Sequence, residues 1–142
     1  MSLKIRTYTP NDRKQVVSLW NDTFPYSTGH NEPEGAIDRK LDIDDGLFFV
    51  AVEGDVIVGT IMAGYAGHRG WIYSVAVNNA FRRRGIGSQL VVHAESALAK
   101  LGCPKVNLQV RADNVAVTAF YESLGFHCEE RISMGKLVGD SA

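Results

Sequence analysis

Three consecutive arginines run directly into a Gly-x-Gly sequence in the middle of this chain, which reads Arg82-Arg83-Arg84-Gly85-Ile86-Gly87. The segment follows a run of β-forming residues and precedes a run with helical spacing, so it lies where a strand turns into a helix. The first turn of a helix presents unpaired N–H groups and the positive end of the helix dipole. Glycines let a ligand approach the backbone closely, and arginines add charge-assisted hydrogen bonds. The pattern therefore predicts a site for a phosphate or pyrophosphate group.

Four interpretations of this segment stay open on residue types and spacing alone. The plainest is an ordinary helix start with a solvated basic face. A Rossmann dinucleotide site needs a third glycine, and Leu90 stands in its place. A P-loop needs Gly-Lys-Ser/Thr after a longer loop, which this segment lacks. The fourth interpretation is a site for the pyrophosphate of coenzyme A.

Apolar periodicity predicts the elements that must position this segment. Runs rich in β-forming residues indicate about seven strands, and helical spacing with capping residues indicates about four helices. The strands are expected at residues 3–8, 47–52, 56–62, 71–77, 105–110, 126–132 and 134–138. The helices are expected from residue 10 through Trp20, at 36–41, at 86–101, and from Asp113 or Asn114 to Leu124. Strands with helices between them give an α/β domain with a mixed sheet.

The arginine–glycine segment resembles the Arg/Gln-x-x-Gly-x-Gly/Ala motif of the GNAT N-acetyltransferase superfamily, which also follows a buried strand and opens a long helix. A second hallmark of that family, Asn…Tyr-x-x-x-Gly-Phe, resembles Asn114 followed by Tyr121-Glu122-Ser123-Leu124-Gly125-Phe126. The order of strands and helices matches over nearly the whole chain. Two motifs in order identify the chain as a GNAT member. The runs Gly59–Tyr65, Gly67–Gly70 and Gly102–Lys105 are further similar to the small bacterial YpeA-type branch.

The resemblance implies a fold and a cosubstrate. The fold is a single GNAT-like domain over residues 1–142, with a mixed, mostly antiparallel sheet and a V-shaped split between strands four and five. The cosubstrate is acetyl-CoA, whose pantetheine arm would lie in that split. Backbone groups of Val75, Ala76 and Val77 would bind pantetheine, and one of their N–H groups would stabilise the oxyanion of the tetrahedral intermediate, worth ~3 kcal/mol. The pyrophosphate would be held by Arg82, Arg83, Arg84, Gly85, Ile86, Gly87 and Ser88.

Asn114 and Tyr121 are seven residues apart, so on a helix both lie on one face. The resemblance implies that Asn114 contacts the pantetheine arm and that Tyr121 protonates the leaving thiolate. A free thiol has a pKa near ~8.5 and a tyrosine near ~10, so full proton transfer is uphill by about 2 kcal/mol. A strong hydrogen bond to the developing charge on sulfur would still lower the barrier. A core aromatic with a satisfied hydroxyl is the plainer interpretation of Tyr121.

The acceptor amine must arrive neutral, yet a catalytic base is hard to find. Some family members carry a glutamate on the fourth strand, where residues 71–77 hold no acid. Bacterial ribosomal-protein N-terminal acetyltransferases carry a glutamate in a Leu-Glu-Val-Arg run, where this chain reads Leu108-Gln109-Val110-Arg111. Glutamine cannot act as a base, which argues against that particular activity. The remaining candidates, each also an ordinary surface residue, are Glu32, Glu34, Asp38 and His68.

Composition narrows the function classes. The formal net charge of −1 argues against a general nucleic-acid binder. Cys103 and Cys128 have no Cys-x-x-Cys spacing and the histidines do not cluster with them, so no metal site is expected. No apolar run approaches a membrane span, and the N-terminus lacks the apolar core of a signal peptide. We therefore expect a cytoplasmic protein with neither nucleic acid nor membrane as a partner.

Three functions from different classes follow. The first is an N-acetyltransferase that moves acetyl from acetyl-CoA to a primary amine by direct attack in a ternary complex, the acceptor being a small-molecule amine or a protein or peptide amine. The second is a non-catalytic acyl-CoA-binding sensor. The presence of Tyr121, the implied proton donor, argues against this function. The third, nucleic-acid binding through the arginines, conflicts with the net charge. Exposed strand edges near the C-terminus could also pair two chains, so a homodimer is a further expectation.

Overall fold

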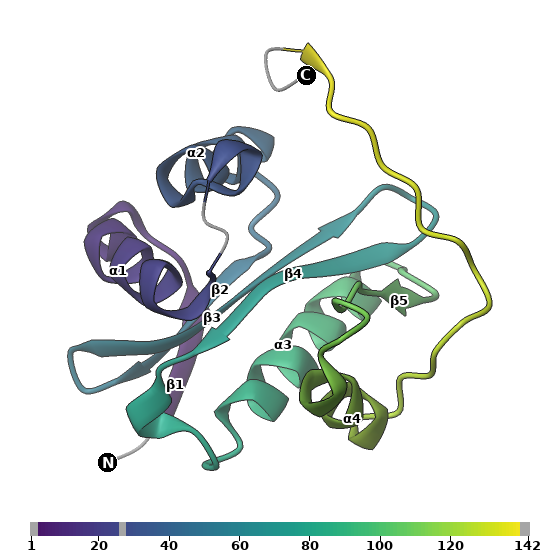
Figure 1. The fold of residues 1–142 in the computed structure, drawn as a ribbon. Coiled ribbons are helices and arrows are strands. Elements are labelled where there is room, and N and C mark those ends of the chain that lie inside the picture. Colours follow the sequence, from purple (N-terminus) through teal and green to yellow (C-terminus); the bar gives the residue numbers. More distant parts are fainter. Residues whose placement is uncertain (1–2, 26–27, 140–142) are drawn as a thin grey trace. The chain divides into compact units, whose positions relative to one another are not determined.

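The computed structural model describes residues 3–25 and 28–139 of the chain. The chain forms two compact units, residues 1–108 and residues 109–142. The first unit holds five strands: β1 (Leu3–Thr7), β2 (Phe48–Glu53), β3 (Val56–Tyr65), β4 (Gly70–Val77) and β5 (Val106–Asn107) (Figure 1). Its helices are α1 (Arg13–Thr23), α2 (Pro33–Ile43) and α3 (Ile86–Lys100), with short 3-10 turns at Pro10–Asp12, Gly29–Asn31 and Asn79–Phe81. The second unit holds α4 (Val115–Ser123).

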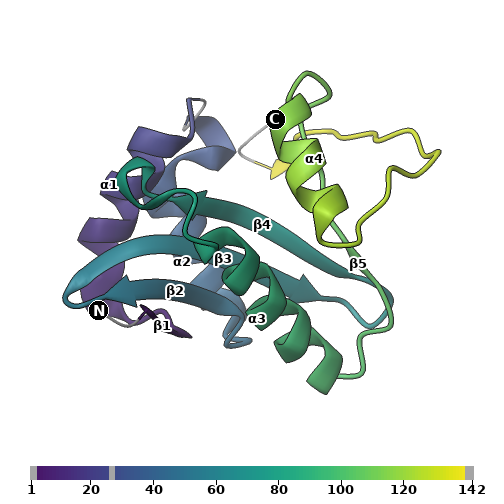
Figure 2. The ribbon, with the colours of Figure 1, turned by 90° about the horizontal axis from the view of Figure 1, so that it is seen from below.

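The strands of the first unit form one sheet in the order β1-β2-β3-β4-β5. The first three pairs are antiparallel, and β4 pairs with β5 in parallel, so the sheet is mixed and mostly antiparallel as predicted. Figure 2 shows α3 lying across one face of this sheet while α1 lies on the other. None of the helices in the described ranges combines the length and apolar composition that crossing a membrane requires.

The prediction of about seven strands was wrong, because the described part of the chain has a sheet of five. The run expected at 105–110 is a strand only at Val106–Asn107. Residues 126–138, expected to hold the last two strands, have no regular secondary structure, although they include the β-branched Ile132 and the apolar Met134. Both of these side chains are about nine-tenths exposed, at 90% and 89%. A strand needs a ladder partner and a buried face, and β-propensity without them does not form one.

The core on the α1 face of the sheet joins both N-terminal helices to the strands. Stacked rings form its centre: Tyr8 lies 4.4 Å from Phe48 and Trp20 lies 5.8 Å from Phe48, centroid to centroid. Val16 and Trp20, four residues apart on α1, are both buried, so they lie on the side of the helix that faces the sheet. Ten buried residues make up this core: Tyr8, Val16, Leu19, Trp20, Ile37, Phe48, Val50, Ile57, Met62 and Ala76.

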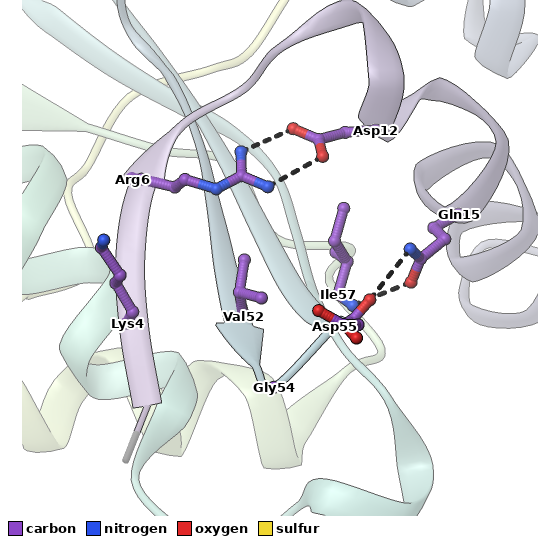
Figure 3. Close-up of a pocket in the computed structure, with 8 residues that line it drawn as sticks. All are labelled: Lys4, Arg6, Asp12, Gln15, Val52, Gly54, Asp55 and Ile57. Atoms are coloured by element: carbon purple, nitrogen blue, oxygen red, sulfur yellow. Dashed lines mark hydrogen bonds and ion pairs between the residues drawn. The ribbon is translucent and has the colours of Figure 1, made fainter.

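A polar pocket lies beside this core, between β1, the start of α1 and the turn that joins β2 to β3 (Figure 3). The Arg6 guanidinium donates to both oxygens of the Asp12 carboxylate, at 2.7 and 2.9 Å, and holds the pKa of Asp12 below its usual range. Gln15 donates to the Asp55 carbonyl at 3.2 Å and accepts from the Ile57 N–H at 2.9 Å. The polar groups of these residues are hydrogen-bonded to one another, and these hydrogen bonds connect the start of α1 to the strands.

On the opposite face, α3 packs closely on the sheet at Gly59 of β3. A Cβ atom at position 59 would lie 2.9 Å from Leu90 Cδ1 and 3.1 Å from the Ala76 carbonyl oxygen. Leu90 is fully buried and the carbonyl belongs to a strand, so neither can move away freely. Glycine at this position therefore permits the close packing of α3 on the sheet.

Replacing Gly59 with alanine should destabilise the protein by ~1–3 kcal/mol through overpacking. The free energy of unfolding can be measured by urea titration followed through tryptophan fluorescence, because both tryptophans, Trp20 and Trp71, lie in the first unit. Gly135→Ala is the matched control, since a Cβ there meets nothing within 4 Å and should leave the transition unchanged. Equal midpoints for the two variants would contradict the close packing at Gly59.

Candidate functional site

The candidate site begins with an irregularity in β4. Thr60 of β3 pairs with Ala76, but Met62 pairs with Tyr73, so two residues of β4 lie opposite one residue of β3. Such an extra residue is a β-bulge, which bends the strand and re-aims the residues next to it. Ser74 lies in the bulge with a φ of 51°, in the left-handed region that non-glycine residues seldom occupy. The backbone of Val75, Ala76 and Val77 follows directly.

Beyond this bulge β4 has an open edge. β5 pairs only with Gly70 and Trp71, at the start of β4. Within the described residues, the segment from Ile72 to Val77 has no strand partner on that side. Unpaired N–H and C=O groups along a strand can bind an extended ligand as if it were another strand. The three residues predicted to bind pantetheine, Val75, Ala76 and Val77, all lie on this open part of β4.

The chain then turns into α3 through the arginine–glycine segment. Arg83 and Gly85 both have positive φ values, 66° and 74°. Gly85 is the N-cap of α3, and no side chain among the described residues caps the helix there. Within the described part of the chain, the first-turn N–H groups at Ile86, Gly87 and Ser88 therefore have no side-chain acceptor. Backbone N–H groups in such a turn form an anion-binding concavity, which supports the predicted site for phosphate.

The three arginines of this segment are not equivalent, although all are exposed. Arg84 donates to both oxygens of Glu53 at 3.4 Å and lies 4.9 Å above the Phe81 ring. The Arg82 Nε donates to the Val77 carbonyl at 3.4 Å, which leaves its two Nη groups. Arg83 forms no ion pair or hydrogen bond with any described residue. Arg84 therefore anchors the segment to β2, and Arg83 is the arginine most available to an anion.

The second unit carries the other two predicted residues. Asn114 is the N-cap of α4, with its Oδ1 accepting from the Val117 N–H at 3.1 Å, which decides between Asp113 and Asn114. The cap orients the Asn114 amide and leaves its NH₂ group as a donor. Asn114 is exposed.

Tyr121 is buried, at 8% exposure, and its ring packs edge-on against Phe120 and Phe126 at centroid distances of 5.0 and 5.6 Å. Burial raises the pKa of the Tyr121 hydroxyl to about 12, because an apolar environment disfavours the phenolate. The hydroxyl forms no hydrogen bond with the described residues. At neutral pH Tyr121 therefore carries its hydroxyl proton, and this O–H group can donate a hydrogen bond to a ligand.

The structure places three of the four candidate bases in local structural roles. Glu32 caps α2, accepting from the Glu34 and Gly35 N–H groups at 2.8 and 2.9 Å. Glu34 and Asp38 bind the Arg13 guanidinium at 2.8 and 2.6 Å. His68 is exposed in the turn between β3 and β4. Glu34 and Asp38 thus link α2 to α1 through Arg13, and Glu32 stabilises the start of α2.

Residues 13–126 match the profile of the Acetyltransferase (GNAT) family. The chain belongs to this family. It is 41% identical over 134 residues to an acetyltransferase from Pectobacterium atrosepticum and 40% identical to one from Yersinia enterocolitica, covering 94% of this chain and of each relative. The solved PaiA N-acetyltransferase of Thermoplasma acidophilum, in complex with coenzyme A, has the same fold, with a TM-score of 0.80 and 20% identity over 93% of this chain and 94% of that one.

Membership of the GNAT family confirms the main expectation from the motifs. The protein is an acetyl-CoA-dependent N-acetyltransferase, and acetyl-CoA is its cosubstrate. Of the four interpretations of the arginine–glycine segment, the coenzyme A site is the one that agrees with this family. The sequence did not reveal the bulge at Ser74 or the buried side chains that contact it, because Trp20 and Thr60 read as ordinary positions of a helix and a strand.

The unequal environments of the arginines predict unequal effects on acetyl-CoA binding. Arg83→Ala should raise the dissociation constant about tenfold at low salt and less at high salt, since charge pairs of exposed groups are screened. Arg84→Ala should act mainly by loosening the contact with Glu53, with a smaller effect on affinity. Isothermal titration with coenzyme A measures both.

Lys14→Ala, which removes an exposed positive charge from α1, is the control for net charge and should leave the affinity unchanged. If Arg84→Ala weakens binding more than Arg83→Ala, the assignment of the two arginines is wrong.

Proposed function

We propose that this acetyltransferase works by direct attack of a primary amine on acetyl-CoA bound along the open edge of β4. The observation that carries the proposal is the continuity of that edge with the uncapped N-terminus of α3. Pantetheine amides pair with the backbone of Val75, Ala76 and Val77, between β4 and β5. The pyrophosphate is held by the N–H groups from Gly85 to Ser88, by the Arg83 side chain and by the two Nη groups of Arg82.

The chemistry starts when the neutral amine attacks the thioester carbonyl carbon. The carbonyl oxygen gains negative charge, and an N–H group of Val75, Ala76 or Val77 stabilises it in the tetrahedral intermediate. A donor of this kind, already oriented before the reaction, contributes ~3 kcal/mol to the rate. The carbon–sulfur bond then breaks, the nitrogen releases one proton to water as the amide forms, and coenzyme A leaves as a thiolate that takes a proton from water.

Tyr121 assists the departure of the thiolate, and Asn114 contacts the pantetheine arm through its NH₂ group. The pKa of Tyr121, about 12, exceeds the ~8.5 of a free thiol by an amount equivalent to roughly 5 kcal/mol, so a complete proton transfer to sulfur is unfavourable. A hydrogen bond that strengthens as charge develops on sulfur remains favourable. Tyr121 therefore acts mainly as a hydrogen-bond donor in the transition state.

The family match runs from residue 13 to residue 126 and so includes both motifs, which supports our proposal that the two units belong to one GNAT domain. The acceptor is an amine of a small molecule, a peptide or a protein. Glu32, Glu34 and Asp38 are engaged and His68 is exposed in a turn, and in our proposal the amine loses its proton to water before the attack. Homodimer formation, cytoplasmic location, the absence of nucleic-acid and membrane partners, and the YpeA-type resemblance remain predictions of the sequence.

Tyr121→Phe tests the proposed donor. It should lower kcat by about 10- to 100-fold while the dissociation constant of acetyl-CoA stays unchanged. The fold should keep its stability, because the hydroxyl has no hydrogen bond with the described residues. Release of free thiol from acetyl-CoA, measured over free amino acids, polyamines, aminoglycosides and short peptides, reports kcat and identifies the acceptor class.

Tyr8→Phe is the matched control, because Tyr8 is also a buried tyrosine whose hydroxyl has no partner among the described residues. The kcat of Tyr8→Phe should equal that of the wild type. A Tyr121→Phe variant with wild-type kcat would remove Tyr121 from the mechanism. Binding of acetyl-CoA with no turnover of any amine would instead favour the acyl-CoA sensor.

The pH dependence of kcat/KM gives an independent test. Activity should rise with pH as the acceptor amine, with an ordinary pKa near ~10.4 for a lysine-type amine, loses its proton. Because burial keeps Tyr121 protonated up to its pKa of about 12, its titration should not lower activity as pH rises toward that value. A decline already present near pH ~9 that disappears in Tyr121→Phe would show that the phenol titrates lower, near the ordinary pKa of ~10 for a tyrosine.

A further inference from the structure

A buried chain of hydrogen bonds connects α1 to the bulge in β4. The indole N–H of Trp20 donates to the Thr60 hydroxyl at 2.8 Å, and this hydroxyl donates to the Ser74 carbonyl at 3.0 Å. Trp20 is 2% exposed and Thr60 is fully buried. The three residues lie in the first unit, on α1, β3 and β4, so the chain crosses from a helix through one strand to the next.

The direction of these hydrogen bonds follows from the donors that are present. An indole nitrogen can only donate, so the Thr60 oxygen must accept from Trp20. A hydroxyl has one proton, and here that proton goes to the Ser74 carbonyl. Thr60 and Asp12 are the buried polar or charged residues among the described residues, and Asp12 belongs to the ion pair with Arg6. Valine would fill the same volume, so the hydroxyl contributes a hydrogen bond that packing alone does not need.

The carbonyl that receives this hydrogen bond belongs to the strained residue. Ser74 has a φ of 51°, and a non-glycine residue holds such a conformation only where its surroundings enforce it. The next N–H groups along β4 are those of Val75, Ala76 and Val77. A rotation of the peptide at Ser74 would redirect the first of these and shift the others.

We propose that Trp20 and Thr60 are positioning residues for acetyl transfer. They hold the Ser74 peptide so that the N–H groups after the bulge lie along the open edge of β4 in the orientation that the thioester requires. This inference rests on the proposed function, in which those groups bind pantetheine and the oxyanion. Neither side chain contacts the substrate, and both act through the backbone of Ser74.

The central variant is Thr60→Val, which keeps the shape of the side chain and removes both hydrogen bonds. We expect kcat to fall at least about tenfold, because small misplacements of a reacting group slow catalysis strongly. The KM for the acceptor amine should stay within about twofold, since no acceptor contact changes. Thr60→Ser retains the hydroxyl and should restore most of kcat.

A second variant separates catalysis from stability. Thr60→Val leaves the buried indole N–H of Trp20 without a partner, which is destabilising. The double variant Trp20→Phe/Thr60→Val removes that unpaired donor, so its melting temperature should recover relative to Thr60→Val with the bulk of the aromatic ring retained. Its kcat should not recover, because the Ser74 carbonyl still lacks a donor. A merely structural role would make stability and kcat recover together.

Two comparisons complete the design. Val16→Ala removes buried volume from the same face of α1 without touching the hydrogen bonds, so it reports the effect of destabilisation alone. Trp20→Phe and the double variant both lack the indole and differ only in the Thr60 hydroxyl. Comparing these two variants tests the role of the Thr60 hydroxyl even if Thr60→Val alone does not fold. The kcat of the double variant should be at least about tenfold below that of Trp20→Phe.

Amide NMR of the wild type with coenzyme A separates this inference from the proposed function. Shifts at Val75, Ala76 and Val77 on binding support the site, and their absence overturns the proposed function itself. With the site confirmed, an unchanged kcat in both valine variants, or an equal loss of kcat in Val16→Ala, overturns the roles of Trp20 and Thr60. The expected result is a loss of kcat in the valine variants together with displaced Ser74 and Val75 amide resonances before ligand is added.

Discussion

The extra residue in β4 is the constraint on which the first unit depends. Alternate residues of a strand point to one face, so Gly70 and Ala76 would share a face if β4 were regular. They do not, because a Cβ at Gly70 would meet Leu98 of α3, whereas Ala76 packs in the core beneath α1. The bulge at Ser74 reverses the alternation between them. Packing on both faces of the sheet therefore requires the irregularity.

Three features of the backbone shape the candidate site. The bulge re-aims the backbone after Ser74, the short β5 leaves that backbone without a strand partner, and the Asn78 N–H bonds to the Val58 carbonyl as the chain leaves the sheet. The chain then enters α3, whose first turns are fixed on the sheet by close contact at Gly59. An extended ligand with hydrogen-bonding amides along its length and a phosphate at one end matches this sequence of backbone groups. Pantetheine joined to a pyrophosphate has that chemistry.

The sequence predicted the parts of this site that depend on residue type and local order. Arg82 through Ser88 form an uncapped helix start, and Asn114 caps α4, because glycine, arginine and asparagine have strong local preferences. Prediction from the sequence failed where a conformation depends on partners that are distant in the chain. The bulge at Ser74 follows from packing against two helices, and residues 126–138 have β-forming side chains but no ladder in the described structure. Neither fact can be read from a window of neighbouring residues.

The acids near α2 show that the chemical role of a carboxylate also cannot be predicted from sequence alone. A carboxylate that caps a helix or binds an arginine has the same sequence signature as one that accepts a proton, and only the positions of Arg13 and the α2 N–H groups distinguish them. With those acids engaged and the pKa of Tyr121 raised, the described residues provide fixed hydrogen-bond donors rather than a strong acid–base pair. Catalysis by such a site depends on how accurately the donors are oriented. In the proposed mechanism, the arrangement of the β4 backbone therefore influences the rate more than the pKa of any one side chain does.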